Sequence, residues 1–229
     1  MKMKLIKVNN ENELSEKGAD IIVSALKLLG EQKKFITIGL VGGRSVSRIY
    51  ELLAKKELPE WTKVHFFLVD ERNVPHEDKE SNYHLLRKHL LNELINKGQI
   101  TEENIHPVNT SLDANSAKNE YEKELNKYGG FFDIVILSSG EDNHVGAIFP
   151  NKNYPENEKF TYFNDSPKPP SERFTATPSL LSKTKLGIVI FSGLSKKDAL
   201  KHFLNKQIEK SLPEKTLQKI SELIILTDQ

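Results

Sequence analysis

The sequence of 229 residues contains no cysteine, which excludes disulfide bonds, thiolate metal sites and a cysteine nucleophile. No apolar run is long enough to span a bilayer, and the first residues lack the apolar segment of a secretory signal. Neither sign of charge dominates, because 33 Lys and Arg residues face 32 Asp and Glu residues. This balance argues against electrostatically driven binding to nucleic acid or to a membrane. From these absences we expect a cytoplasmic protein. From the charge balance we expect neither nucleic acid nor a membrane as a partner.

Several common functional motifs are also missing. The patterns GK[ST] and GxGxxG are absent, so no nucleotide is implied, and no GxSxG elbow marks a serine hydrolase. No pair of histidines has ligand spacing with a carboxylate, and we therefore expect no protein-bound metal. His84 and His89 would point to different faces of a helix. The histidines without any local signal, which we expect to be structural or exposed, are His65, His76, His106 and His202.

The sequence does contain a regular alternation of strand-length apolar runs with stretches of helical period. Strands are predicted at 3–8, 35–41, 64–69, 132–137, 173–177, 186–191 and 223–226, and helices around 14–29, 49–53, 82–95, 114–128 and 195–204. This alternation predicts a predominantly parallel, doubly wound α/β sheet with helices on both faces. No linker separates two units, so we expect one domain over residues 1–229. The Pro-rich stretch 166–170 is interpreted as a loop over a site.

The most informative segment follows the predicted strand 132–137. The chain breaks there at Ser-Ser-Gly and then presents Asp142 and His144. Ligands of open parallel sheets bind just beyond the carboxyl ends of strands, and a carboxylate two residues from an imidazole is placed for general base chemistry. The alternative is a polar loop whose histidine merely caps the next element, and this segment alone does not decide between the two.

Two further strand ends suggest anion binding. The segment GLVGGRS places Gly42 and Gly43 between a strand and a helix start, where backbone N–H groups and the helix dipole suit a phosphate. A tight connection without a ligand is the alternative. In the segment FSGLSKKDAL, Lys196 stands in a first helical turn, where a cation is unfavourable unless an anion lies nearby. Arg173, at the start of a strand, is another candidate anion ligand, although an ordinary surface arginine gives the same pattern.

The fourth strand end, VDERNVP, presents Asp70, Glu71 and Arg72 directly after the strand 64–69. Clustered opposite charges can simply satisfy one another at a strand terminus. The functional interpretation is a carboxylate for proton transfer and a guanidinium for an anionic or carbonyl group. Ser81 is a predicted N-cap of the helix that follows.

These four segments, in this order, resemble the 6-phosphogluconolactonase family, within the wider group that includes the glucosamine-6-phosphate deaminases. GLVGGRS is similar to the family's Gly-Gly phosphate loop, and VDERNVP with the later SNY is similar to Asp-Glu-Arg-x-Val-Pro followed by Ser-Asn. GEDNHVGAIFP resembles Gly-x-Asp-Gly-His-Thr-Ala-Ser-Leu-Phe-Pro. SPKPPSERFTATPSLL resembles the lactonases' Ser-Pro-Lys-Pro-Pro segment, and FSGLSKKDAL resembles Gly-x-x-Lys.

The resemblance implies hydrolysis of 6-phospho-D-glucono-1,5-lactone to 6-phosphogluconate in the oxidative pentose phosphate pathway, without a metal or organic cofactor. It implies that His144 takes a proton from water, that Asp142 orients the imidazole, and that Asp70 and Arg72 complete the catalytic set. We expect a monomer or a weak homo-oligomer. The implied phosphate ligands are Gly42, Gly43, Arg44, Ser45, Arg173 and Lys196.

The chain departs from the family pattern at Val41, at Val46 and at 143–147. Asn143 stands where the family has glycine, but asparagine tolerates left-handed backbone, so we expect the turn to be kept. The changes at 143–147 are the only support for a catalytically silent sugar-phosphate-binding protein. The other alternative is an amino-sugar phosphate deaminase-isomerase, whose members have an acid five residues after the histidine. Phe149 stands at that position here, which favours the lactonase.

Overall fold

The computed structural model describes residues 2–229, and a seven-stranded sheet forms its centre. The strand order is β1-β10-β9-β6-β2-β3-β5, and all six pairings are parallel. The strands are β1 (Lys2–Lys7), β2 (Ile36–Leu40), β3 (Val64–Leu68), β5 (Ile105–His106), β6 (Ile134–Ser138), β9 (Leu186–Phe191) and β10 (Glu222–Thr227). The predicted parallel sheet is therefore confirmed.

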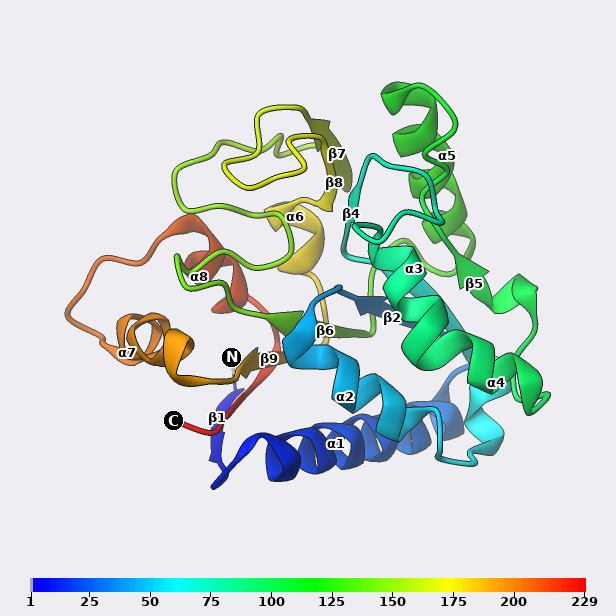
Figure 1. The fold of residues 1–229 in the computed structure, drawn as a ribbon, viewed down its shortest axis with the longest axis horizontal. Coiled ribbons are helices and arrows are strands. Elements are labelled where there is room, and N and C mark those ends of the chain that lie inside the picture. The colour runs from blue at the N-terminus through cyan, green and yellow to red at the C-terminus, as the bar shows by residue number, and fades with distance from the viewer. Residues whose placement is uncertain (1) are drawn as a thin grey trace.

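Helices lie on both sides of this sheet, as the sequence predicts. Figure 1 shows α1 and α2 along one side and α5, α6 and α8 on the other. The helices are α1 (Glu11–Gln32), α2 (Arg44–Leu53), α3 (Asn82–Leu86), α4 (Asn92–Asn96), α5 (Ala114–Lys127), α6 (Pro178–Leu181), α7 (Lys197–Leu204) and α8 (Leu212–Leu217). Because both faces are covered, every residue of β2 and β3 is buried.

Side-chain caps set the starts of α1 and α3, and the cap at Ser81 is the predicted one. α1 begins after Asn10, whose side chain accepts a hydrogen bond from the backbone N–H of Glu13 at 3.0 Å. Ser81 caps α3 in the same way, by accepting from the N–H of His84 at 3.1 Å. The predicted helix 82–95 is present, with a π-helical turn between α3 and α4. None of the helices in the part of the chain that the structure describes could cross a membrane.

A second, smaller sheet was not predicted. β4 (Asp70–Arg72), β8 (Arg173–Ala176) and β7 (Phe160–Phe163) form a three-stranded antiparallel sheet in the order β4-β8-β7. The predicted strand 173–177 therefore exists but belongs to this sheet. β7 lies in a stretch where the sequence predicts no strand. Strands of three or four residues show too little alternation of apolar and polar residues to be recognised. The antiparallel pairing places Arg173, where the loop ahead of β8 ends, opposite Arg72 at the end of β4.

Candidate active site

A cavity of about 420 Å³ lies at the carboxyl ends of β2, β6 and β9 and beside β4. Parallel strands deliver their carboxyl ends to one edge of a sheet, so the loops that follow them meet there. Every predicted site residue except Asp142 and Arg173 lines this cavity. The predicted residues that line it are Gly42, Gly43, Arg44, Ser45, Asp70, Arg72, His144 and Lys196.

The glycine pair after β2 shapes the part of the cavity where α2 begins. Gly43 has a φ of 119°, a backbone conformation that favours glycine. Gly42 lies against Asn82, since a Cβ at Gly42 would come 2.0 Å from the Asn82 Oδ1. Within residues 2–229, no side chain caps the first turn of α2. Its unpaired backbone N–H groups therefore have the properties of an anion site.

Glu71, in the middle of β4, anchors this strand to α3. Its buried carboxylate accepts hydrogen bonds from the backbone N–H groups of Asn82 and Tyr83 at 2.7 and 2.8 Å. It also accepts one from the hydroxyl of Ser81 at 3.0 Å. Burial raises the pKa of Glu71, and backbone hydrogen bonds partly oppose that rise. Glu71 is thus a structural member of the charged segment and fixes the position of the residues on either side of it.

We expect Glu71→Gln to lower the free energy of unfolding by about 1–3 kcal/mol. The carboxylate accepts hydrogen bonds from backbone N–H groups, and the amide of glutamine would place its own N–H donors against some of them. Urea denaturation of the variant beside the wild type measures this loss. The exposed Glu77 supplies a matched control, and Glu77→Gln should leave the midpoint unchanged. Equal midpoints for Glu71→Gln and the wild type would show that the carboxylate does not hold the segment.

Asp70 and Arg72 both reach the cavity from β4. Asp70 is 6% exposed, and its backbone carbonyl accepts a hydrogen bond from Nδ2 of Asn82 at 2.8 Å. Arg72 donates to the carbonyl of Glu80, while its buried Nε has no hydrogen-bond partner within residues 2–229. A guanidinium that lines a cavity and keeps an unused buried donor can bind an anion or a carbonyl oxygen.

Asp142 and His144 form a hydrogen-bonded pair in the turn after β6. Nδ1 of His144 lies 2.5 Å from Oδ1 of Asp142, so Nδ1 carries the proton and Nε2 is the basic nitrogen. Asn143 has a φ of 66°, which confirms that asparagine keeps the left-handed turn. Gly140 lies directly beneath the pair, since a Cβ there would be 2.1 Å from Nδ1 of His144. The geometry is that of a general base with an orienting carboxylate.

Burial and charge favour the basic form of this pair. Burial lowers the pKa of His144, and the neighbouring Asp142 opposes the shift only in part. Burial by itself would raise the pKa of Asp142, but the hydrogen bond from His144 and the ammonium group of Lys168 outweigh it and lower this pKa to about 2. At neutral pH the pair therefore consists of a neutral imidazole and an ionised carboxylate.

Cationic side chains gather around the same cavity. Lys196 ends the 3-10 turn Leu194–Lys196 ahead of α7 and lines the cavity together with Arg44. Burial lowers the pKa of Lys196; Glu141 opposes this shift, and the charges of Lys168 and Arg44 add to it. An anion bound among these cations would relieve their mutual repulsion.

Arg173 does not line the cavity, and its role as a phosphate ligand stays a prediction. The residue is 5% exposed, and its Nη2 donates to the carbonyl of Pro169 at 2.8 Å and to that of Lys168 at 3.4 Å. Arg173 opens β8 directly opposite Arg72 in β4. Nη2 of Arg173 therefore holds the loop ahead of β8, while its buried Nε has no hydrogen-bond partner within residues 2–229.

Lys168 is the site residue that sequence reasoning missed. Its Nζ lies 3.1 Å from Oδ1 of Asp142 and 3.5 Å from Nδ1 of His144. The Pro-rich stretch 166–170 therefore does lie over the site, as the sequence predicts. The available signal was the Ser-Pro-Lys-Pro-Pro segment itself, which supported the family resemblance without indicating a contact.

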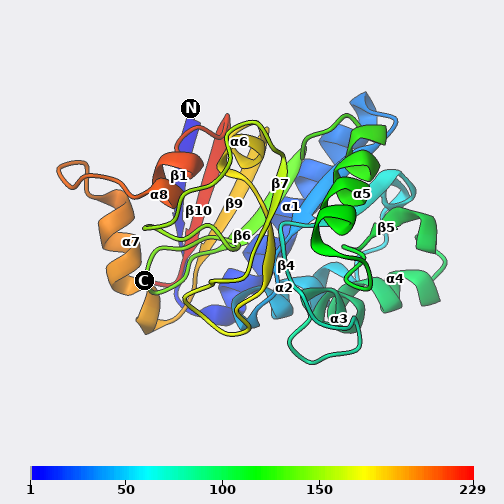
Figure 2. The ribbon, with the colours of Figure 1, turned by 90° about the horizontal axis from the view of Figure 1, so that it is seen from above.

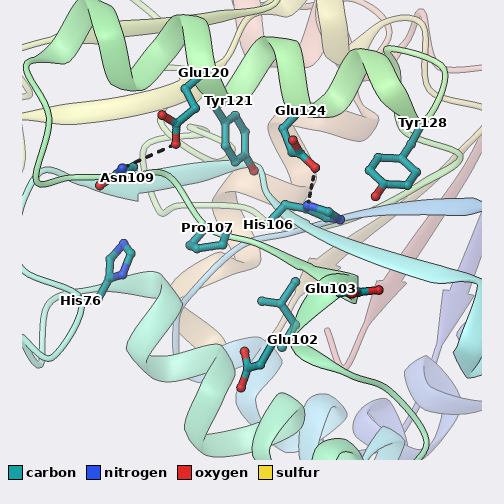
Figure 3. A pocket seen from close by; sticks show the side chains of 11 residues that line it. His76, Glu102, Glu103, His106, Pro107, Asn109, Glu120, Tyr121, Glu124 and Tyr128 are labelled. Atoms are coloured by element: carbon teal, nitrogen blue, oxygen red, sulfur yellow. Dashed lines mark hydrogen bonds and ion pairs between the residues drawn. The ribbon is translucent and has the colours of Figure 1, made fainter.

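A second cavity of about 520 Å³ lies beside the edge strand β5 and is shown in Figure 3. Carboxylates and imidazoles are prominent in its wall, and neither Lys nor Arg is among its lining residues. His106 is paired with Glu124 at 3.3 Å and with the buried His65 at 2.9 Å. A cavity without cations is unsuited to a phosphate, and both histidines are placed as structural residues. Within residues 2–229, no group of three or more His, Asp or Glu side chains could hold a metal ion.

The buried histidine pair predicts a loss of stability in acid. Burial lowers the pKa of His65 and of His106 to about 4. In the unfolded chain, histidines bind protons from a pH of about 6.5 downward. Between about pH 6.5 and 4, both histidines are therefore neutral in the folded protein but protonated in the unfolded chain. The free energy of unfolding should therefore fall as the pH decreases from about 6.5 towards 4. Urea titrations across this range should show a shallower fall for His106→Gln but not for the exposed control His84→Gln. Identical pH slopes for both variants and the wild type would contradict this account.

Comparison with known proteins assigns the chain to a family. A family model described as glucosamine-6-phosphate isomerases/6-phosphogluconolactonase matches residues 9–225. The chain belongs to this family. A relative named 6-phosphogluconolactonase from Borreliella burgdorferi is 33% identical over 231 residues, which cover 99% of this chain and 96% of the relative. A relative of the same name from Thermotoga maritima is 33% identical over 178 residues, which cover 78% of each chain.

Solved structures agree with membership of the glucosamine-6-phosphate isomerase/6-phosphogluconolactonase family. The crystal structure of 6-phosphogluconolactonase from Thermotoga maritima superposes with a TM-score of 0.82 at 29% identity, covering 99% of this chain and 98% of that one. 6-Phosphogluconolactonase from Trypanosoma cruzi gives a TM-score of 0.85 at 25% identity, covering 99% and 94%. The family resemblance and the α/β fold expected from the sequence are thus confirmed, whereas the roles of individual site residues stay predictions.

Proposed function

We propose that this protein hydrolyses 6-phospho-D-glucono-1,5-lactone to 6-phosphogluconate. The observation that carries the proposal is the hydrogen-bonded pair of Asp142 and His144 at a cavity that Arg44, Arg72 and Lys196 make cationic. A neutral base can activate water, and the cations can bind the substrate phosphate. The names of the relatives from Borreliella burgdorferi and Thermotoga maritima support the same substrate.

In the proposed reaction, the phosphate binds at the start of α2, to the backbone N–H groups of Gly42 to Ser45 and to the side chains of Arg44 and Lys196. This remote contact fixes the lactone ring for attack. Nε2 of His144 takes a proton from water as the water oxygen bonds to the lactone carbonyl carbon. Arg72 stabilises the oxyanion that forms.

The second half of the proposed reaction opens the ring. The bond between the former carbonyl carbon and the ring oxygen breaks, and His144 returns its proton to that oxygen. Asp142 stabilises the imidazolium in the interval between the two proton transfers. Asp70, which lines the cavity without contacting His144, is positioned to bind sugar hydroxyls and is the alternative base within the site.

Amino-sugar phosphate isomerisation is disfavoured by Phe149. Its ring is 5% exposed and packs at 5.0 Å from the ring of His144. The position where the deaminase-isomerases have a carboxylate is therefore filled by an apolar ring in this chain. No comparable observation favours that reaction.

A direct assay tests the proposed function. The purified protein is added to freshly prepared 6-phosphogluconolactone, and acid release is followed in a weakly buffered indicator solution, with the spontaneous ring opening subtracted. Ammonia release from glucosamine 6-phosphate is measured in parallel. Hydrolysis of the lactone above background supports the proposal. Thermal stabilisation by the product without any turnover would instead identify a silent sugar-phosphate-binding protein.

A further inference from the structure

The loop ahead of β8 places one charge against the Asp142 and His144 pair. Nζ of Lys168 lies 3.1 Å from the same Oδ1 of Asp142 to which His144 is bonded. The ammonium group of Lys168 and the imidazole of His144 thus share one carboxylate oxygen of Asp142. Like Asp142, Lys168 is not among the residues that line the cavity.

The loop that carries Lys168 is itself held in place by hydrogen bonds. The N–H of Ser166 donates to the carbonyl of Ser171 at 3.0 Å and closes the loop. Nη2 of the buried Arg173 donates to the carbonyls of Pro169 and Lys168. The backbone of Lys168 is therefore fixed from the side of β8, although its side chain stays 44% exposed.

We propose that Lys168 is a positioning residue for the catalytic pair, which fixes the carboxylate of Asp142 and disfavours protonation of His144, and that Arg173 acts through it. This inference rests on the proposed function of the same site. An ammonium group 3.5 Å from Nδ1 of His144 repels an imidazolium, while the carboxylate it fixes attracts one. Because the two charges act in opposite directions on one imidazole, their balance sets the lowest pH at which the base is free.

Other charged groups share the cavity with His144. Besides Asp142 and Lys168, the carboxylate of Asp70 acts on the imidazole and favours its protonated form. The remaining charged groups that line the same cavity are Arg44, Arg72, Glu141 and Lys196. These groups are unchanged when Lys168 is replaced, so a change in the titration of His144 then reports the removed ammonium group.

The experiment measures the titration of His144 directly, by NMR of the imidazole in the free protein and by the acid limb of kcat/KM. Removing the ammonium group in Lys168→Met should raise the His144 midpoint by roughly one pH unit. Lys168→Arg keeps the charge and should return the midpoint to that of the wild type. Asp142→Asn should move it the opposite way, to lower pH. Lys197, an exposed lysine that follows Lys196 in the chain, gives the control, and Lys197→Met should leave the midpoint unchanged.

A double variant tests the role assigned to Arg173. Arg173→Met should raise the midpoint in the same direction as Lys168→Met, and the two changes together should raise it no further than Lys168→Met alone, because they act on one path. Circular dichroism checks that each variant is folded. An unchanged His144 midpoint in folded Lys168→Met, or an equal rise in Lys168→Arg, would overturn the inference. The NMR titration needs no turnover, so it stands apart from the lactonase assay that tests the proposed function.

Discussion

Replacing His144 with Asn is expected to reduce turnover of the lactone by about 10²–10⁴-fold, the usual contribution of a general base. Asparagine keeps a hydrogen-bonding group next to Asp142 but cannot take a proton from water. Because the proposed phosphate site lies elsewhere in the cavity, KM should change little. The measurement is the initial rate of acid release after the spontaneous hydrolysis of the lactone is subtracted.

The pH dependence of the wild type supplies the matching test. Only the neutral imidazole is a base, and burial lowers the pKa of His144 below its ordinary value of 6.5. The rate should therefore persist to a lower pH than a free imidazole would allow and should fall only below that point. Asp142→Asn should be milder than His144→Asn, since it removes orientation and charge but leaves the base. If His144→Asn keeps near-full turnover, another group is the base, and Asp70 is the first candidate.

Replacing Lys196 with Ala should weaken the reaction of the phosphorylated lactone selectively. A charge-assisted contact is worth roughly 1.5–3 kcal/mol, which corresponds to about a 10–150-fold loss in kcat/KM. The same variant should act on unphosphorylated gluconolactone as the wild type does, because that substrate has no phosphate to bind. Both rates are measured with the same acid-release assay.

Two other variants make the phosphate test specific. Lys197→Ala removes an equal charge from the exposed neighbour and should change neither rate. Arg173→Ala should lower both rates by similar factors, since Arg173 donates to loop carbonyls and is proposed to position Lys168 beside Asp142. Equal losses on the two substrates for Lys196→Ala would show that this lysine does not bind the phosphate.

The sequence predicts the main sheet and the position of the cavity because both depend on local patterns. Apolar runs alternating with helical periods indicate parallel strands, and parallel strands place their carboxyl ends at one edge. Residues directly after those ends, such as Gly42, Asp70 and His144, are therefore brought together without any knowledge of distant contacts. Asn143 could also be assigned from its conformational preference alone.

Residues whose role depends on a distant partner could not be assigned in this way. Lys168 meets Asp142 across 26 positions of the chain, and nothing in its immediate neighbours indicates that contact. Arg173 was predicted to bind phosphate because an arginine at the start of a strand can face a ligand. The direction of its side chain depends on the antiparallel pairing of β8 with β4, and the sheet that contains this pair was not predicted. Glu71 looked like part of a charge cluster, yet its partners are backbone groups of α3.

The parallel pairing of β1 with β10 has a practical consequence for handling the protein. β1 begins at the edge of the sheet formed by the amino ends of the strands, and the chain leaves β10 at the opposite edge, formed by their carboxyl ends (Figure 2). The cavity lies at this second edge. There, Asp228 accepts a hydrogen bond from the N–H of Gly193 at 3.0 Å, and Gly193 opens the turn that carries Lys196. An affinity tag attached after Gln229 would therefore begin next to the turn that carries Lys196, whereas a tag placed ahead of β1 would leave from the edge formed by the amino ends of the strands.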